Sequence, residues 1–300
     1  MKKQLLILLL LIPALVHSQA WKRYRKEICI GIGATNFLGD LGGANQIGTH
    51  VFKDIEFSLT RPDISFGFRY FITQNISAKG GLYYGVISGN DKLTKQPYRQ
   101  NRNLSFKSNI WELSAQFELS GVTVYREGHR YDIKRAHGYK NVLFQAYGFA
   151  GVGVFHFNPK GYYKGRYYAL RDLGTEGQGL PGEPDKYKRF SVCLPIGAGF
   201  RYGISRQWNI GLEYGIRKTF TDYIDDVSGV YYDKEAIREA YGDPAAYFSN
   251  PSDTKDVSKY SWTSPGQDRG HPNYKDSYMF MFVTLNYRIP DFHGRTNTRF

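Results

Sequence analysis

The sequence predicts an all-β fold: an eight-stranded antiparallel transmembrane β-barrel of outer-membrane type, behind an N-terminal signal peptide. The chain opens with a short apolar run after two lysines, and then alternates apolar and polar residues in short stretches. It is also rich in aromatic residues, with 25 Tyr and 20 Phe among 300 residues. Amphipathic strands behind an export signal, with rings at both bilayer interfaces, are typical of outer-membrane barrels. A secreted all-β protein with a tyrosine-rich binding face is the alternative.

Residues 1–18 are expected to be the signal peptide, and residues 19–300 a single outer-membrane β-barrel domain. Two lysines precede an apolar run over 5–16, and Ser18 stands at the expected cleavage point. At about twelve residues, the run is shorter than the roughly 20 that a spanning helix needs. Pro13 interrupts the run, and no cysteine stands directly after it for lipoprotein acylation.

Period-two alternation predicts four strands in the first part of the chain, at 27–35, 64–72, 76–87 and 109–119. Apolar residues form one set in each strand and would face lipid. In chain order these sets include Ile28, Ile30 and Ile32; Ile64, Phe66 and Phe68; Leu82 and Tyr84; Trp111, Leu113 and Phe117. The intervening residues are rich in glycine and carry single charges, as a narrow, filled lumen requires.

Four more strands are predicted at 142–157, 191–203, 208–220 and 278–289. The fifth is apolar on both faces, so its inward side stays open. The sixth is the most regular, but Pro195 on its inward set predicts a local break in the ladder. Eight strands suit the smallest closed barrel, and closure leaves no backbone edge in hydrocarbon.

The predicted connections alternate between short and long. Links 73–75 and 205–207 are tight turns, and 120–141 is a longer link on the same side. This alternation predicts periplasmic turns, extracellular loops and both termini in the periplasm. The long links are 36–62, 88–108, 158–190 and 221–277, and the last is expected to hold a helix from Lys234 to Tyr241 with Asp233 as its N-cap.

Seven charged residues fall on the inward sets of the predicted strands. A buried charge must be paired, and both signs are present, so we expect a network of ion pairs that plugs the lumen. A selective pore or a proton path is the alternative. The seven are Arg69, Lys79, Glu112, Glu118, Arg201, Glu213 and Arg217.

The formal net charge is +13, and basic residues gather where three segments meet at the predicted periplasmic rim. We expect this rim to dock a periplasmic protein; scattered solubilising charge is the alternative. The chain's export argues against nucleic acid and leaves outer-membrane lipids as the other partner. The candidate docking residues are Lys22, Arg23, Arg25, Lys26, Cys29, Arg126, Arg130, Lys134 and Arg135.

Both cysteines fall on inward sets of strands that are not neighbours, so no disulfide between them is expected. Cys29 lies nearer the periplasmic rim than Cys193 and is therefore the candidate for an intermolecular partner. Two inert lumen thiols are the alternative.

The sequence predicts no enzyme, no cofactor and no metal. Its histidines stand in no nucleophile or zinc motif, and His271 with Asp268 or Asp276 is only an unspecific pair at the outer rim. An acidic cluster opens the last loop and offers the oxygen ligands that Ca²⁺ prefers, but without EF-hand spacing. It consists of Asp222, Asp225, Asp226 and Asp233.

Several short motifs occur in order over nearly the whole mature chain, mostly at loop junctions. They are Gly39–Gly43, Thr60-Arg61-Pro62, Arg69-Tyr70, Ile87–Asp91, Arg102–Phe106, Glu112-Leu113-Ser114, Phe157–Lys160 and Asp222–Ser228. As an ordered set, they resemble the Bacteroidetes outer-membrane barrels similar to PorG, a component of the type IX secretion system. The resemblance implies a non-enzymatic barrel that associates with a periplasmic ring built around a lipoprotein, through the basic rim and Cys29. A narrow pore or solute-uptake barrel remains the alternative function.

Overall fold

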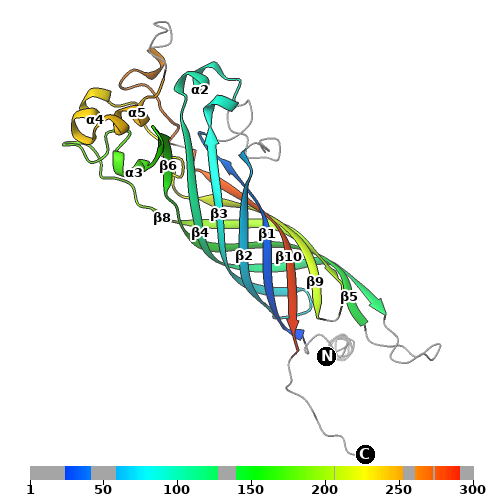
Figure 1. Ribbon diagram of the computed structural model, residues 1–300. Helices are drawn as coiled ribbons and strands as arrows, with labels where there is room; N and C mark the ends of the chain where they lie inside the picture. Colours follow the sequence, from blue (N-terminus) through cyan, green and yellow to red (C-terminus); the bar gives the residue numbers. More distant parts are fainter. Residues whose placement is uncertain are drawn as a thin grey trace, which may run out of the picture.

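Eight long strands close into an antiparallel barrel in the computed structural model (Figure 1), which describes residues 24–41, 59–127, 140–205, 207–252, 261–272 and 274–290. Each barrel strand pairs with the next, and β1 pairs with β10, so the ring is complete. The predicted fold is therefore confirmed. The strands are β1 (Lys26–Leu38), β2 (Arg61–Phe71), β3 (Ile76–Asn90), β4 (Ser105–Glu127), β5 (Lys140–His156), β8 (Phe190–Gly203), β9 (Trp208–Thr219) and β10 (Ser277–Ile289).

Alternation along these strands sorts side chains between lipid and lumen. Outward positions are mostly apolar and exposed, as at Ile32 (67 %) and Phe117 (66 %). On β3, β4, β5 and β8 no outward-facing position described between the aromatic rows carries a charge, whereas β9 carries Lys218 on its outward side near the head. On β5 these rows lie at His156 and Phe144. Twelve residues of tilted strand span roughly 30 Å along the barrel axis, which matches a bilayer's hydrocarbon core.

One prediction about the strands needs correction, and another is confirmed in detail. The link expected at 120–141 is partly strand, because β4 and β5 stay paired down to Glu127↔Lys140, with register shifts near Val122 and Tyr125. The break expected at Pro195 occurs: the β5–β8 ladder has no partners between Ala150↔Ile196 and Gly153↔Cys193, although the register is unchanged. A proline has no N–H to donate to that ladder.

The long links meet at one end of the barrel and form a head of short elements, whereas β1 begins and β10 ends at the other end (Figure 1). The helix predicted from Lys234 is confirmed, and Asp233 caps it by accepting from the Glu235 amide at 2.9 Å. The β6–β7 hairpin lies within the link predicted at 158–190 and was not expected there. The head contains η5 (Asp91–Leu93), α2 (Pro97–Arg102), β6 (Pro159–Tyr163), β7 (Arg166–Ala169), α3 (Leu170–Leu173), α4 (Lys234–Tyr241), α5 (Asp243–Ser249) and η6 (Ser261–Thr263).

The two tight turns at the opposite end use the same local chemistry. Thr73 Oγ1 accepts from the Ile76 amide at 3.0 Å, and Ser205 Oγ accepts from the Trp208 amide at 3.1 Å. Hydroxyl side chains close such turns by bonding the backbone a few residues ahead. None of the helices in the described part of the chain is long and apolar enough to span a membrane.

Candidate functional site

The periplasmic half of the lumen holds a network of charged side chains. Arg69 Nε donates to both carboxylate oxygens of Glu118, at 3.0 and 2.8 Å, and Arg69 also pairs with Glu27. Arg201 Nη2 lies 3.2 Å from Glu118 Oε2, and Arg288 Nε lies 3.3 Å from Glu27 Oε1. All five side chains are buried. Since a buried charge without a partner is costly, this network ties five strands together across the lumen.

Two further ion pairs lie higher in the lumen. Lys79 Nζ is 2.7 Å from Glu213 Oε2, and Arg217 Nε is 3.2 Å from Glu112 Oε2. The structure thus places all seven predicted lumen charges inside the barrel and gives each an oppositely charged partner.

Sequence reasoning left four members of this network out. Glu27 and Arg288 occupy inward positions of β1 and β10, so the alternation carried a signal for both. Tyr147 and Tyr278 donate hydroxyl hydrogen bonds at 3.0 Å to Glu213 and Glu112 respectively. No sequence pattern indicated that the two tyrosines belong to this network, because the chain carries tyrosine on both faces of its strands.

Aromatic side chains pack the lumen near and above the upper ion pairs. Tyr83, Phe155, Phe157, Phe280 and Phe282 are each at most 1 % exposed. Neighbouring rings lie in contact, with centroids 5.5 Å apart for Phe280 and Phe282. A water-filled channel would leave such side chains exposed, so this part of the lumen is filled by protein.

The periplasmic rim is only partly described. Arg25 Nη1 donates to the Tyr70 hydroxyl at 3.4 Å, and Lys26 begins β1. For Arg126 the structure describes the backbone, in β4, and no more. The other predicted docking residues, Lys22, Arg23, Arg130, Lys134 and Arg135, lie outside the described residues.

Cys29 does not lie on an accessible surface. It faces the lumen, is 3 % exposed and is a free thiol, as is the buried Cys193. A buried thiol cannot reach a partner protein at the rim, so we remove Cys29 from the docking surface.

A two-stranded ribbon extends past the rest of the barrel at the end opposite the head (Figure 1). The pairing of β3 with β4 ends at Ile76↔Leu119, and that of β5 with β8 ends at Phe144↔Tyr202. Below these points β4 and β5 pair only with each other among the described strands. We call residues 121–127 and 140–143 the periplasmic ribbon. Seven residues of strand correspond to roughly 20 Å.

The acidic residues of the last loop do not form one site. Asp233 caps α4, and Asp226 accepts from Thr175 Oγ1 at 2.5 Å and from the Tyr187 hydroxyl at 2.6 Å. Burial raises the pKa of Asp226 to about 6, although Arg269 nearby lowers it. Among the described residues, no group of three or more His, Cys, Asp or Glu side chains is arranged to hold a metal ion.

Asp222 and Asp225 instead gather with Asp40 and Asp276 beneath the head. Burial, with repulsion from Asp40, raises the pKa of Asp222 to about 7. The pKa values of Asp225 and Asp276 rise well above the usual range, first by burial and then by repulsion from the neighbouring carboxylates. We call these four residues the carboxylate cluster. Backbone amides satisfy some of its oxygens, as where the Ile224 amide donates to Asp276 Oδ2 at 2.9 Å.

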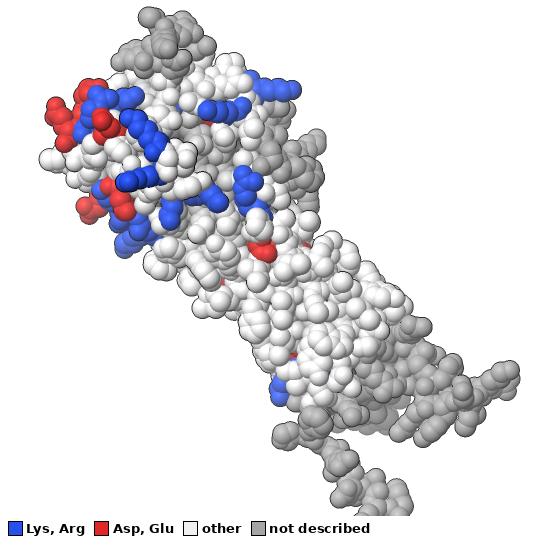
Figure 2. Space-filling view, in the orientation of Figure 1, with Lys and Arg blue, Asp and Glu red and all other residues white. Residues whose placement is uncertain are grey.

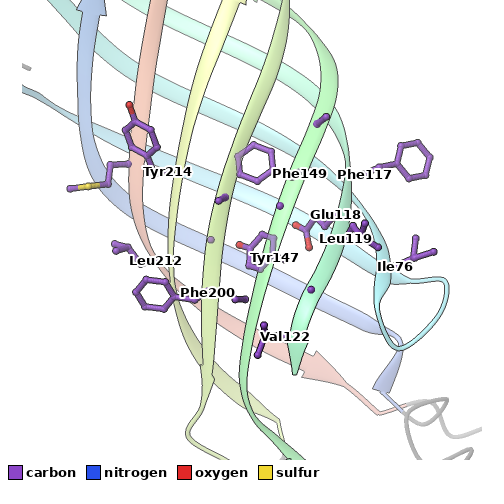
Figure 3. A pocket seen from close by; sticks show the side chains of 17 residues that line it. Ile76, Phe117, Glu118, Leu119, Val122, Tyr147, Phe149, Phe200, Leu212 and Tyr214 are labelled. Carbon is purple, nitrogen blue, oxygen red and sulfur yellow. The ribbon is translucent and has the colours of Figure 1, made fainter. Parts of the chain in front are cut away.

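The outer wall of the barrel has an apolar groove of about 1110 Å³ over β4, β5 and β8. Its floor is made of small residues such as Gly148 and Ala198. In Figure 3, Phe117 lies on one side of the groove and Phe200 on the other, with the inward-facing Tyr147 between them. In a bilayer this groove lies against lipid chains.

The closed barrel and its largely apolar outer wall place the chain in a bacterial outer membrane. Each barrel strand pairs with a neighbour on both sides, so the ring leaves no open strand edge to hydrocarbon, and rows of aromatic side chains mark both interfaces. Figure 2 shows the same division on the face in view: few charged residues lie on the described part of the shaft, and most gather on the head.

Comparison with solved structures finds barrels of distant sequence. The attachment invasion locus protein Ail of Yersinia pestis is 8 % identical, with 89 % of this chain and 99 % of that chain covered and a TM-score of 0.37. OprG of Pseudomonas aeruginosa is 9 % identical, with 90 % and 98 % covered and a TM-score of 0.36. Neisserial surface protein A is 7 % identical, with 89 % and 96 % covered and a TM-score of 0.34. At these values we draw no conclusion from the likenesses, and the fold rests on the strand pairing described above.

No curated protein matches the sequence. A family profile matches residues 2–159, which is just over half of the chain. That match runs from the start of the chain through β5, and so takes in five of the eight barrel strands. The protein therefore belongs to the family described as domain of unknown function DUF6089.

Proposed function

We propose that this protein is a non-enzymatic, plugged outer-membrane barrel that serves as a structural component of a protein assembly. In this role the barrel is an anchor, and a periplasmic protein docks on its basic rim. The packing of the lumen supports an anchor rather than a conduit, because ion pairs and aromatic rings occupy its interior.

The single observation that carries the proposal is the periplasmic ribbon. Its backbone edges have no partner among the described strands, and exposed edges offer N–H and C=O groups to another protein. Val122 and Val124 are 55 % and 44 % exposed, so the ribbon also offers apolar contacts. Arg126 lies on it, and the sequence from 128 to 139 adds further basic residues.

The resemblance to PorG-like barrels extends this proposal to a type IX secretion complex in a member of the Bacteroidetes. On that basis the partner is a ring lipoprotein in the periplasm. An acidic surface on the partner would fit the basic rim.

The decisive experiment reverses the rim charges. A tagged variant with Arg126→Glu, Arg130→Glu, Lys134→Glu and Arg135→Glu is recovered from native membranes, and the co-purified periplasmic proteins are quantified by mass spectrometry. We expect at least a tenfold loss of the principal partner. Undiminished recovery would defeat the docking proposal.

A matched control reverses four exposed basic residues of the head instead: Lys92→Glu, Lys164→Glu, Arg166→Glu and Lys188→Glu. The net charge changes equally, and partner recovery should stay at the wild-type level. Planar-bilayer recording tests the plugged lumen independently. Steady unitary conductance by the wild type would favour the pore alternative.

A further inference from the structure

A row of four aromatic side chains marks the interface at the head end of the barrel. Tyr84, Trp111, His156 and Phe190 are successive register partners on β3, β4, β5 and β8. The rings of Tyr84 and Trp111 have centroids 4.6 Å apart, and those of His156 and Phe190 lie 4.8 Å apart. Since rings of this kind sit at the level where hydrocarbon meets headgroups, the row locates that boundary on this sector of the barrel.

Two lysines lie side by side just beyond this row. Lys107 of β4 and Lys160 of β6 are direct register partners, and both side chains are exposed. Neither forms an ion pair with any residue in the described part of the chain. Like charges directly opposite one another are destabilising in a sheet. An anion bound between the two ammonium groups would remove this repulsion.

The height of the pair fits the headgroup layer. Lys107 is four residues above Trp111 on the same face of β4, or roughly 13 Å along the strand. With the tilt of barrel strands, this is about 10 Å along the membrane normal. The headgroup layer is several ångströms thick, and lysine stems bend toward it.

The β6–β7 hairpin continues the same surface away from the membrane. Tyr162 follows Lys160 on the same face, and its register partner is Tyr167. Their rings have centroids 5.1 Å apart, and the two side chains are 58 % and 60 % exposed. Exposed aromatic faces suit the apolar faces of sugar rings. Figure 2 shows Lys and Arg gathered where the uncharged shaft meets the head.

We propose that Lys107 and Lys160 bind a phosphate group of an anionic glycolipid in the outer leaflet. Its sugar rings lie against Tyr162 and Tyr167, and its acyl chains run down the apolar wall below Trp111. Charge complementarity selects the phosphate, and the position directly above the aromatic row selects a lipid over a soluble phosphate. This site lies at the opposite end of the barrel from the rim proposed for docking, so either proposal can fail without the other.

Native mass spectrometry in detergent tests the proposal on the full-length mature barrel. The probes are a bisphosphorylated lipid A, the same lipid A after dephosphorylation, phosphatidylglycerol and inorganic phosphate. We expect the wild type to retain the phosphorylated lipid A at least tenfold better than each other probe. The Lys107→Gln/Lys160→Gln variant should lose about 30-fold in affinity, since each lysine near an anionic surface contributes a roughly fivefold factor.

The matched control is Lys164→Gln/Arg166→Gln, which removes two charges from the far end of the same hairpin. It should change the affinity less than threefold. Heat-modifiable gel mobility confirms that every variant is folded. Equal retention of phosphorylated lipid A by the Lys107/Lys160 variant, or equal binding of the dephosphorylated form by the wild type, would overturn the proposal. Equal binding of phosphatidylglycerol would overturn its assignment to a glycolipid.

Discussion

The lumen and the carboxylate cluster of the head both bury carboxylates, but they stabilise them by different means. In the lumen each buried glutamate has a cationic partner from another strand, as Glu213 has Lys79 at 2.7 Å. In the carboxylate cluster of the head, Asp222, Asp225 and Asp276 repel one another and Asp40, and burial with this repulsion raises their pKa values although Lys275 and Arg102 act in the opposite direction. The lumen thus pairs its glutamates with cations, whereas the carboxylate cluster favours the protonated form of its aspartates.

This difference follows from how the two regions are built. Closure of the barrel fixes eight strands in register, so a lysine on β3 and a glutamate on β9 meet across the lumen even though 134 positions separate them. The head is assembled from loops, and its carboxylates accept from backbone amides such as those of Leu41 and Ile224. Amides satisfy the oxygens without neutralising the charge, so a proton must do so.

The largest expected effect comes from breaking a lumen pair. Lys79→Met leaves the Glu213 carboxylate buried without its cation, and the lost partner should cost about 3–5 kcal/mol of unfolding free energy. Urea unfolding in detergent micelles, followed by tryptophan fluorescence, measures this loss.

The double variant Lys79→Met/Glu213→Gln is the control for that experiment. The amide keeps an acceptor for the Tyr147 hydroxyl, which donates to Glu213 at 3.0 Å, and removes the unpaired charge. Most of the lost stability should return. If the single variant were as stable as the wild type, the ion pair between Lys79 and Glu213 would not stabilise the barrel.

Alternation along the strands predicted the barrel and its inward charges, and the capping residue Asp233 predicted the helix at Lys234, because period two and capping are local properties of the chain. The partners of those charges were not local. Nothing near Arg69 in the sequence indicates Glu118, since the two meet only when β2 and β4 close around the lumen. The β6–β7 hairpin escaped notice for a related reason: Tyr163 packs against Tyr247 and Phe248, with ring centroids 4.5 and 6.2 Å away, and both belong to a helix of another loop.

The second prediction concerns the pH dependence of the head. Because the pKa of Asp222 is about 7 in the folded protein and 3.8 is its ordinary value, folding favours the protonated form. The stability associated with this proton is fully present below pH 4 and is lost as the pH rises to about 7. Asp222→Asn should therefore stabilise the protein by on the order of 1–3 kcal/mol at pH 8 and have little effect at pH 4.

Thermal unfolding at the two pH values checks this prediction. Asp172→Asn serves as the comparison, because Asp172 is exposed and pairs with Arg189 at 2.8 Å. That change should give no gain in stability at pH 8. An Asp222→Asn variant that is equally destabilised at both pH values would show that the cluster holds its carboxylates as ions after all.

The smallest loss of stability is expected when an ion pair on the surface, rather than in the lumen, is removed. Arg238 of α4 pairs with Glu235, and also lies 3.3 Å from Asp243 at Nε, but its side chain is 42 % exposed. In water such a pair loses most of its Coulomb energy to screening, so Arg238→Ala should cost roughly 0.5 kcal/mol or less. The same urea titration compares it with Lys79→Met, and added salt should weaken only the surface pair, since buried pairs are screened far less. A cost for Arg238→Ala that rivalled the cost of the lumen variant would mean that burial is not what separates the two regions.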